Sequence, residues 1–270
     1  MPHSKGHLNP GSPGVSLDRV ELSAKYTELV RHVWVVRWRL PVGEVSQQRV
    51  LTYPAFNLIF SDQSATLYGP NPKVSVQTLS GQGWALGLLL RPAAGPLLTS
   101  TSPRRLLAQS EPMPGAPTIE IAAAMARNSP PSALTLIEAW LGPYARRVGS
   151  AGRLVNRVCR VVEEDRTLVR VVDVARRVGV STRSLERLIM AHVGVTPKWL
   201  IECRRLQEAA TTLFARPETP LTELALDLGY VDYAHFYRRY KAILAETPNK
   251  TRTSAQIARR PHGRQTASHR

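Results

Sequence analysis

The sequence lacks the patterns that mark membrane and metal-binding proteins. Its longest apolar run, "WALGLLL", stops at Arg91, well short of the roughly 18 residues that cross a bilayer. The two cysteines, Cys159 and Cys203, show no metal-ligand or CxxC spacing, and the histidines form no HxH or HExxH pair. We therefore expect no membrane segment, no metal, no cofactor and a reduced, cytoplasmic location.

Motifs of catalysis and nucleotide binding are also missing. The chain contains no GxSxG, no Walker A sequence and no GxGxxG. The sequence therefore predicts a protein that is not an enzyme.

Acidic residues are scarce relative to basic ones. The chain has 36 Lys and Arg against 20 Asp and Glu, which gives a net charge of +16 in 270 residues. Residues 151–270 hold 22 basic and 12 acidic residues, so they carry the larger share, +10. This balance favours a polyanionic partner, although a GC-rich genome would also raise the arginine count.

Hydrophobic periodicity divides the chain into two parts. From Val33 to Arg91 the hydrophobic pattern has a period of two. In "VWVVRWRL", the apolar even-numbered residues, which include Trp34 and Trp38, face one side, and Arg37 and Arg39 face the other. Beyond "SEPMPGAP" the period becomes helical, and the small residues of "GSAG" mark the boundary. We expect a disordered N-terminal tail (1–25), a β-rich domain (26–149), a helical domain (150–253) and a basic disordered tail (254–270).

A duplication lies within the helical part. Ala175 and Gly179 recur 50 residues later as Ala225 and Gly229, whereas Leu185 recurs 51 residues later as Phe236. One inserted residue in the second turn reconciles the two offsets. Each copy closes with Thr-Pro.

The residues of each copy suit two helices joined by a tight turn. The small alanine lets the helices approach, and the glycine accepts a positive φ. Ser181 or Thr182 caps the following helix in the first copy, and Asp232 does so in the second. This is the pattern of a helix-turn-helix, whose second helix enters the DNA major groove.

Here the sequence resembles the AraC/XylS family of transcription regulators. The resemblance covers about residues 153–252 and rests on "DVARRVGVSTRSLERLI", "TPKWLIECRRLQEAATTL" and "LTELALDLGYVDYAHFYRRYK". The sequence departs from the family at Arg239, where an apolar residue is usual, and in the ending "TPNKTR". A related class of alkyl-transfer repair enzymes needs four zinc-binding cysteines, which this chain lacks.

The resemblance implies an α+β protein. It would comprise an N-terminal antiparallel β barrel or sandwich-like sensor domain, followed by an all-α DNA-binding domain with two helix-turn-helix units. A connector helix from Pro197 to Ala215 would link the units; at about 1.5 Å per residue it spans roughly 28 Å. This is less than the ~34 Å between successive major grooves, so we expect the site to bend. The alternative is that only one recognition helix inserts fully while the other, expected to be that of the second copy, rests on the DNA backbone.

The exposed faces of the second helices supply the expected DNA contacts. The predicted base contacts are Arg183, Glu186, Arg187, Tyr233, Tyr237 and Arg238. The predicted backbone contacts are Ser181, Thr182, Lys198, Arg204, Arg205, Arg239 and Lys241.

The aromatic residues of the β-rich domain either fill its core or border an effector pocket. The candidates are Trp34, Trp38, Tyr53, Phe56 and Trp84. By resemblance, this domain senses a small molecule or forms a homodimer, and couples to the DNA-binding domain through helices around Leu134–Arg147. Double-stranded DNA is the expected partner, and RNA polymerase is a further candidate. The alternative is a constitutive, architectural DNA-binding protein without effector sensing.

Overall fold

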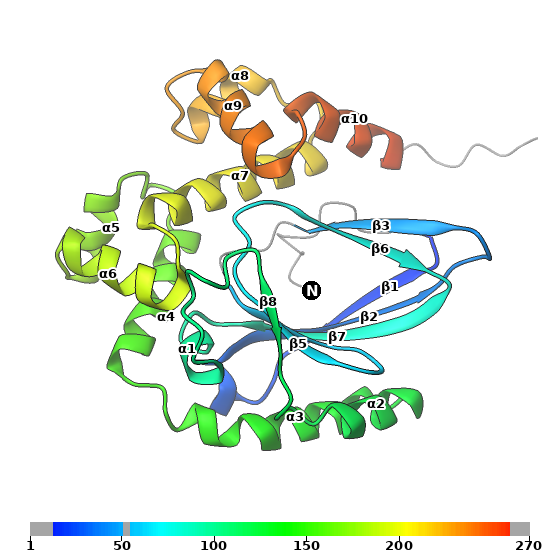
Figure 1. Ribbon diagram of the computed structural model, residues 1–270. Coiled ribbons are helices and arrows are strands. Elements are labelled where there is room, and N and C mark those ends of the chain that lie inside the picture. The colour runs from blue at the N-terminus through cyan, green and yellow to red at the C-terminus, as the bar shows by residue number, and fades with distance from the viewer. Residues whose placement is uncertain (1–12, 51–54, 260–270) are drawn as a thin grey trace, which may run out of the picture.

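The computed structural model describes residues 13–50 and 55–259, with the backbone alone for the last three. It confirms the expected α+β class: an antiparallel sheet domain precedes a helical domain (Figure 1). The strands are β1 (Val15–Val20), β2 (Val30–Arg39), β3 (Val45–Val50), β4 (Asn57–Phe60), β5 (Ala65–Tyr68), β6 (Ser75–Ser80), β7 (Gln82–Leu90) and β8 (Ser110–Pro112). Six form one sheet in the order β1-β2-β7-β4-β5-β8, and β3 pairs separately with β6.

The core of this domain lies against the sheet face that carries the odd-numbered residues of β2. Val33 pairs with Leu88, and Val35 with Leu86, and all four side chains are buried. Helices α2 (Thr118–Ala126) and α3 (Pro130–Ala145) bury their apolar residues in the same core. Figure 1 shows both helices along one side of the sheet.

The tryptophans of β2 occupy the opposite face. Trp34 lies across from Gly87 and Trp38 across from Gly83 in the β2–β7 register. A Cβ at either glycine would overlap the facing indole, so the glycines make room for the rings. The expected alternation of Trp34 and Trp38 with arginines is correct, but the core forms on the arginine side.

Both chain ends are more ordered than expected. The predicted tail at 1–25 contains β1 and the start of the short helix η1 (Ala24–Tyr26), and β1 pairs along its whole length with β2. The predicted tail at 254–270 begins inside α10 (Pro248–Arg259). Composition alone was misleading here, because β1 is stabilised by sheet pairing and α10 packs on α7 and α9. Residues 1–12 and 260–270 lie outside the described part.

Helices make up most of the remaining described residues. The short α1 (Gly95–Leu98) follows β7, and α4 (Ser150–Glu164) begins where the domain boundary was expected. Then come α5 (Val171–Val178), α6 (Thr182–Val193), α7 (Pro197–Ala215), α8 (Leu221–Asp227) and α9 (Tyr233–Leu244). Two apolar cores form on α7: one with α4 to α6, the other with α8 and α9. Among the described residues, no helix combines the length and hydropathy needed to span a membrane.

Among the described residues, two separate sets of hydrogen bonds and ion pairs join the two domains. At the first, Asn156 of α4 is buried; its amide oxygen accepts from the backbone N–H of Ala93 (3.0 Å), and its amide nitrogen donates to the carbonyl of Glu28 (2.8 Å). Nearby, Arg31 of β2 forms an ion pair with Glu163 of α4. These bonds attach the first helical core to the sheet domain.

The second contact is made by the β3–β6 hairpin. Arg49 of β3 forms an ion pair with Glu246 and donates to the carbonyl of Leu244 at 2.9 Å. The backbone N–H of Val74 donates to the carbonyl of Ile243, and its side chain packs on the second helical core. Among the described residues, the hydrogen bonds between the domains therefore come from β2, β3 and the loops. Coupling through the helices around 134–147 stays a prediction.

His32 should make the fold sensitive to mild acid. Burial, followed by the charges of Arg19, Arg31 and Arg91, lowers the pKa of its imidazole from 6.5 to about 4. The unfolded chain binds this proton near pH 6.5, so the stability from neutral His32 is present above that pH and is lost as the pH falls toward 4. We expect the His32→Gln variant to gain stability relative to wild type between about pH 7.5 and about pH 5, as measured by urea unfolding. A stability difference that does not change with pH would contradict this assignment.

Candidate DNA interface

The first helix-turn-helix consists of α5 and α6. Gly179 ends α5 with φ +76°, and the backbone N–H of Val180 donates to the carbonyl of Ala175 at 3.0 Å. Ser181 then caps α6, because its hydroxyl accepts from the N–H of Ser184. Of the two cap residues considered, Ser181 is the cap, and Thr182 is the first residue of the helix.

The second unit, α8 and α9, makes the same backbone hydrogen bond in its turn and the same kind of capping bond. Gly229 has φ +77°, and the N–H of Tyr230 donates to the carbonyl of Ala225 at 2.9 Å. The carboxylate of Asp232 accepts from the N–H of His235 and caps α9. Two copies of one turn, each with its small residue buried, confirm the duplication.

The predicted base-contacting residues lie together on the outer faces of α6 and α9. Arg183, Glu186 and Arg187 are exposed on α6, and Arg238 is exposed on α9. Tyr233 and Tyr237 are half-buried, with ring centroids 6.0 Å apart. The first face is therefore charged, whereas the second combines one guanidinium with two phenols.

Two further residues on the second face went unnoticed in the sequence. Val231 is 83% exposed in the turn before α9, and Ala234 is exposed in the first turn of the helix. Small apolar side chains at the start of a recognition helix suit contact with thymine methyl groups. The sequence did hold a signal for Val231. The spacing between the two copies changes from 50 to 51 residues within the second turn, and Val231 lies in that longer turn.

Helix α7 has the bounds expected for the connector. Thr196 caps it by accepting from the N–H of Trp199, and Pro197 occupies its first turn. Figure 1 shows α7 running between the α5–α6 and α8–α9 pairs. Its middle is buried on nearly every side, because each pair packs on a different face.

This burial overturns the assignment of Arg204 and Arg205 to the DNA backbone. Arg204 donates from its two terminal nitrogens to the carbonyls of Asp165 and Leu168, both at 3.3 Å. Arg205 donates to the carbonyl of Leu228 at 2.6 Å, and its guanidinium lies 3.8 Å from the Tyr230 ring centroid. Consecutive helix residues point about 100° apart, so the two arginines reach opposite units.

Arg239 also has a structural partner. Its Nε donates at 3.2 Å to Glu202, a buried carboxylate on α7 that also accepts from the hydroxyl of Tyr230 at 2.9 Å. Burial, followed by the nearby Glu202, raises the pKa of Tyr230 well above its usual value, so the phenol remains a donor. This carboxylate gives the arginine at position 239 a buried counter-ion on α7.

The remaining predicted backbone contacts are accessible. Ser181, Thr182, Lys198 and Lys241 are exposed at the ends of α6, α7 and α9.

Neither cysteine is placed for chemistry. Both thiols are buried, and burial raises the pKa of Cys159 to about 12 and that of Cys203 still further. The described residues contain no group of three or more His, Cys, Asp or Glu side chains suited to a metal.

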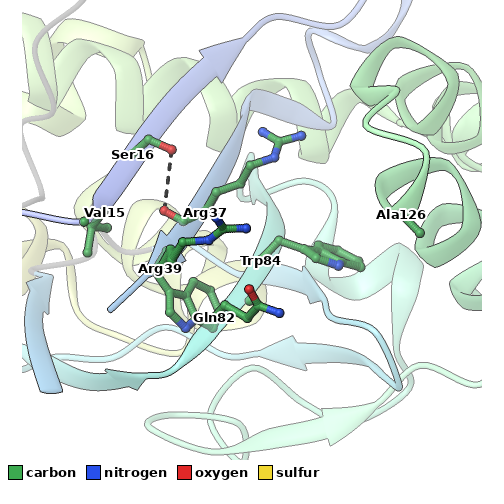
Figure 2. Close-up of a pocket in the computed structure, with 10 residues that line it drawn as sticks. Val15, Ser16, Arg37, Arg39, Gln82, Trp84 and Ala126 are labelled. Carbon is green, nitrogen blue, oxygen red and sulfur yellow. Dashed lines mark hydrogen bonds between the residues drawn. The ribbon is translucent and has the colours of Figure 1, made fainter. Parts of the chain in front are cut away.

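The aromatic residues predicted to border an effector pocket do not lie together at one site in the structure. Phe56 is fully buried in the core, where its ring leaves no room for a Cβ at Gly95. Trp34 donates its indole N–H to Asn57 at 3.2 Å. Trp38 and Trp84 both line a surface groove, in which Figure 2 shows Trp84. Tyr53 falls outside the described residues.

Comparison with known proteins agrees with this geometry. Residues 174–254 match the family model of a helix-turn-helix domain. The XylDLEGF operon transcriptional activator 2 of Pseudomonas putida is 30% identical over 100 residues, which cover 36% of this chain and 63% of the activator. These matches bear out the resemblance of the chain to the AraC/XylS family. The match spans less than two thirds of that relative.

The N-terminal domain has a separate match. Residues 22–112 fit a family described as a domain of unknown function (DUF6597). Among solved structures, a probable AraC family transcriptional regulator from Rhodopseudomonas palustris is 26% identical, covers 38% of this chain and 97% of its own, and has a TM-score of 0.35. ToxT from Vibrio cholerae is 11% identical, covers 89% of this chain and 97% of its own, and has a TM-score of 0.44.

Proposed function

We propose that this protein regulates transcription by binding specific duplex DNA with α6 and α9 in successive major grooves. The repeated turn is the observation that carries the proposal, because it presents two recognition helices from one rigid connector. The net charge of +16 supports a DNA partner, since Lys and Arg neutralise phosphates.

The two faces have different roles in this proposal. Arg183, Glu186 and Arg187 of α6 read base edges with charged groups, whereas α9 offers Arg238 beside apolar and phenolic groups. Lys198 and Lys241 contact phosphates. The 19 residues of α7 span roughly 28 Å, less than the ~34 Å between grooves, so binding bends the DNA.

The N-terminal domain makes this binding responsive to a small molecule. It contacts each helical core separately, through Asn156 of α4 and through Glu246 after α9. A ligand that shifts the sheet domain would thereby change how the two units are held, and so the DNA affinity.

Arg187→Ala tests sequence-specific reading. A site selected from random duplexes by wild type should show one base position where the variant loses preference, at a cost of about 1–3 kcal/mol measured by fluorescence anisotropy. The matched control is Arg146→Ala, which removes the same charge from an exposed site in the N-terminal domain. Equal weakening on every sequence would instead make Arg187 a phosphate contact.

A further inference from the structure

A loop of the sheet domain lies against the end of the first recognition helix. The segment 99–109 joins α1 to β8, and Pro103 and Arg104 in its middle contact Gly194, the residue that ends α6. A Cβ at Gly194 would lie 2.7 Å from the carbonyl of Pro103 and 2.8 Å from the backbone nitrogen of Arg104, so the loop fits only against a glycine. The contact brings part of the sheet domain to the end of a helix that is proposed to read DNA.

The loop is held in this place from both sides. Leu106 is buried in the core of the sheet domain, and its backbone leaves no room for a Cβ at Gly69. Leu107 packs instead on the first helical core. The backbone N–H of Ala108 donates to the carbonyl of Pro70 at 3.0 Å. The loop is therefore a fixed part of the surface around α6.

Gly194 continues the exposed row of α6 that faces DNA in the proposed function. Arg183, Arg187 and Met190 are exposed at helical spacing, and Gly194 follows four residues after Met190. The seven residues from Arg187 to Gly194 turn the helix through about 700°, which is roughly 20° short of two full turns. The loop therefore lies at the C-terminal end of the same row.

The length of this row brings the loop to the edge of the major groove. From Arg183 to Gly194 the helix rises roughly 16 Å, at about 1.5 Å per residue. The major groove is about 12 Å wide, and the N-terminal residues of a recognition helix contact its base edges. When Arg183 and Arg187 lie at base edges, the end of α6 lies beside the phosphates that border the groove.

The side chains that the loop exposes are suited to phosphates. Arg104 and Arg105 are exposed, and neither makes a side-chain hydrogen bond or ion pair with any described residue. Lys198, a predicted phosphate contact, is exposed in the first turn of α7, four residues after Gly194. The segments 99–110 and 190–201 contain no acidic residue. Three cations therefore lie near the α6–α7 turn, and neither segment supplies a carboxylate to pair with them.

We infer that Arg104 and Arg105 bind the DNA backbone at the outer edge of the half-site that α6 reads. A guanidinium donates paired N–H groups to phosphate oxygens, and each such contact releases counterions from the duplex. Because phosphate contacts fix register and orientation, the sheet domain helps to hold α6 in one position on the DNA. The inference rests on the proposed function, and it extends the interface to a domain outside the helix-turn-helix units.

The salt dependence of DNA binding by the full chain tests the inference. The probes are a duplex selected from random sequences by wild type and a scrambled duplex of the same length. The double variant Arg104→Gln, Arg105→Gln should reduce the slope of log K against log salt by about two units, because each phosphate contact contributes about 0.9. Its loss of affinity relative to wild type should therefore be about tenfold larger at about 50 mM than at about 200 mM salt.

Two further double variants are the controls. Arg104→Lys, Arg105→Lys keeps both charges and should keep the wild-type slope. Arg39→Gln, Arg127→Gln removes two exposed charges from the same domain and should also keep it. Arg39 lines a groove with the last residue of α2, and Arg127 follows that residue; Figure 1 shows α2 and α6 on opposite sides of the molecule. Unchanged melting temperatures establish that the variants are folded.

Ethylation interference locates the contact on the DNA. Ethylation of the phosphates beside the base pair identified with Arg187→Ala should weaken binding by wild type, but not by the Arg104→Gln, Arg105→Gln variant. An unchanged salt slope in this variant, or an interference pattern identical to that of wild type, would overturn the inference.

The scrambled duplex separates this inference from the proposed function. If wild type prefers the selected duplex and the glutamine variant keeps its salt slope, the phosphate contact is overturned alone. If the slope depends on both arginines but wild type binds the two duplexes equally, the phosphate contact is upheld and sequence-specific reading is overturned.

Discussion

Glu202→Ala is expected to lower the free energy of unfolding by about 3 kcal/mol. The variant leaves the buried hydroxyl of Tyr230 without its acceptor and Arg239 without its counter-ion. It also removes the negative charge that acts on Tyr230 together with Arg205 and Arg239. Urea unfolding of the full chain measures the loss, and Glu202→Gln, which retains an acceptor oxygen, should cost less.

Glu208→Ala provides the matched control on the same helix. Glu208 pairs with Arg166 at 3.0 Å, but the arginine side chain is 77% exposed. Surface pairs of this kind contribute about 0–1 kcal/mol, so this variant should remain near wild type. Similar losses for the two variants would show that the Glu202 cluster contributes no more than a surface pair.

Arg49→Met should release the second helix-turn-helix from the sheet domain, at a cost of about 2–3 kcal/mol. The side chain of Glu246 is only 4% exposed, and Arg49 is its ion-pair partner. In the variant, Glu246 keeps the hydroxyl of Thr251 as a donor, which does not balance its charge. We expect faster amide hydrogen exchange in α9 and α10, with α5 and α6 unaffected.

Lys73→Met is the control for the loss of a positive charge near this hairpin. Lys73 is exposed just before β6, and its side chain makes no ion pair among the described residues. Its exchange pattern should match that of wild type. Faster exchange spread evenly over both helix-turn-helix units would mean that Arg49 stabilises the whole chain and does not attach the second unit.

The helix-turn-helix units could be predicted because their signals are local. Gly179 must adopt a positive φ within a turn, and Ser181 caps a helix whose N–H groups lie three residues away. Pro197 opens α7 for an equally local reason. Such preferences act over a few residues, so they can be recognised without knowing what packs nearby.

The errors share a different cause. Arg204 and Arg205 resembled phosphate contacts because an isolated basic helix would expose them. In the structure, two cores cover different faces of α7, and both arginines serve as donors to loop carbonyls. The strand β1 and the helix α10 were likewise missed, because the polar composition of these segments led to the prediction of disordered tails.

The two turns, their caps, the connector and the exposed faces of α6 and α9 could be predicted from the residues alone, since each follows from periodicity and backbone preference. Which charged groups remain available depends on how distant segments pack together. Arg205 and Arg239 are engaged because α8 and α9 fold against α7, whereas Arg37 and Arg39 are open because α2 ends at Ala126. The partners of a side chain can come from segments far away in the sequence, and a local sequence pattern does not show which of those segments pack against it.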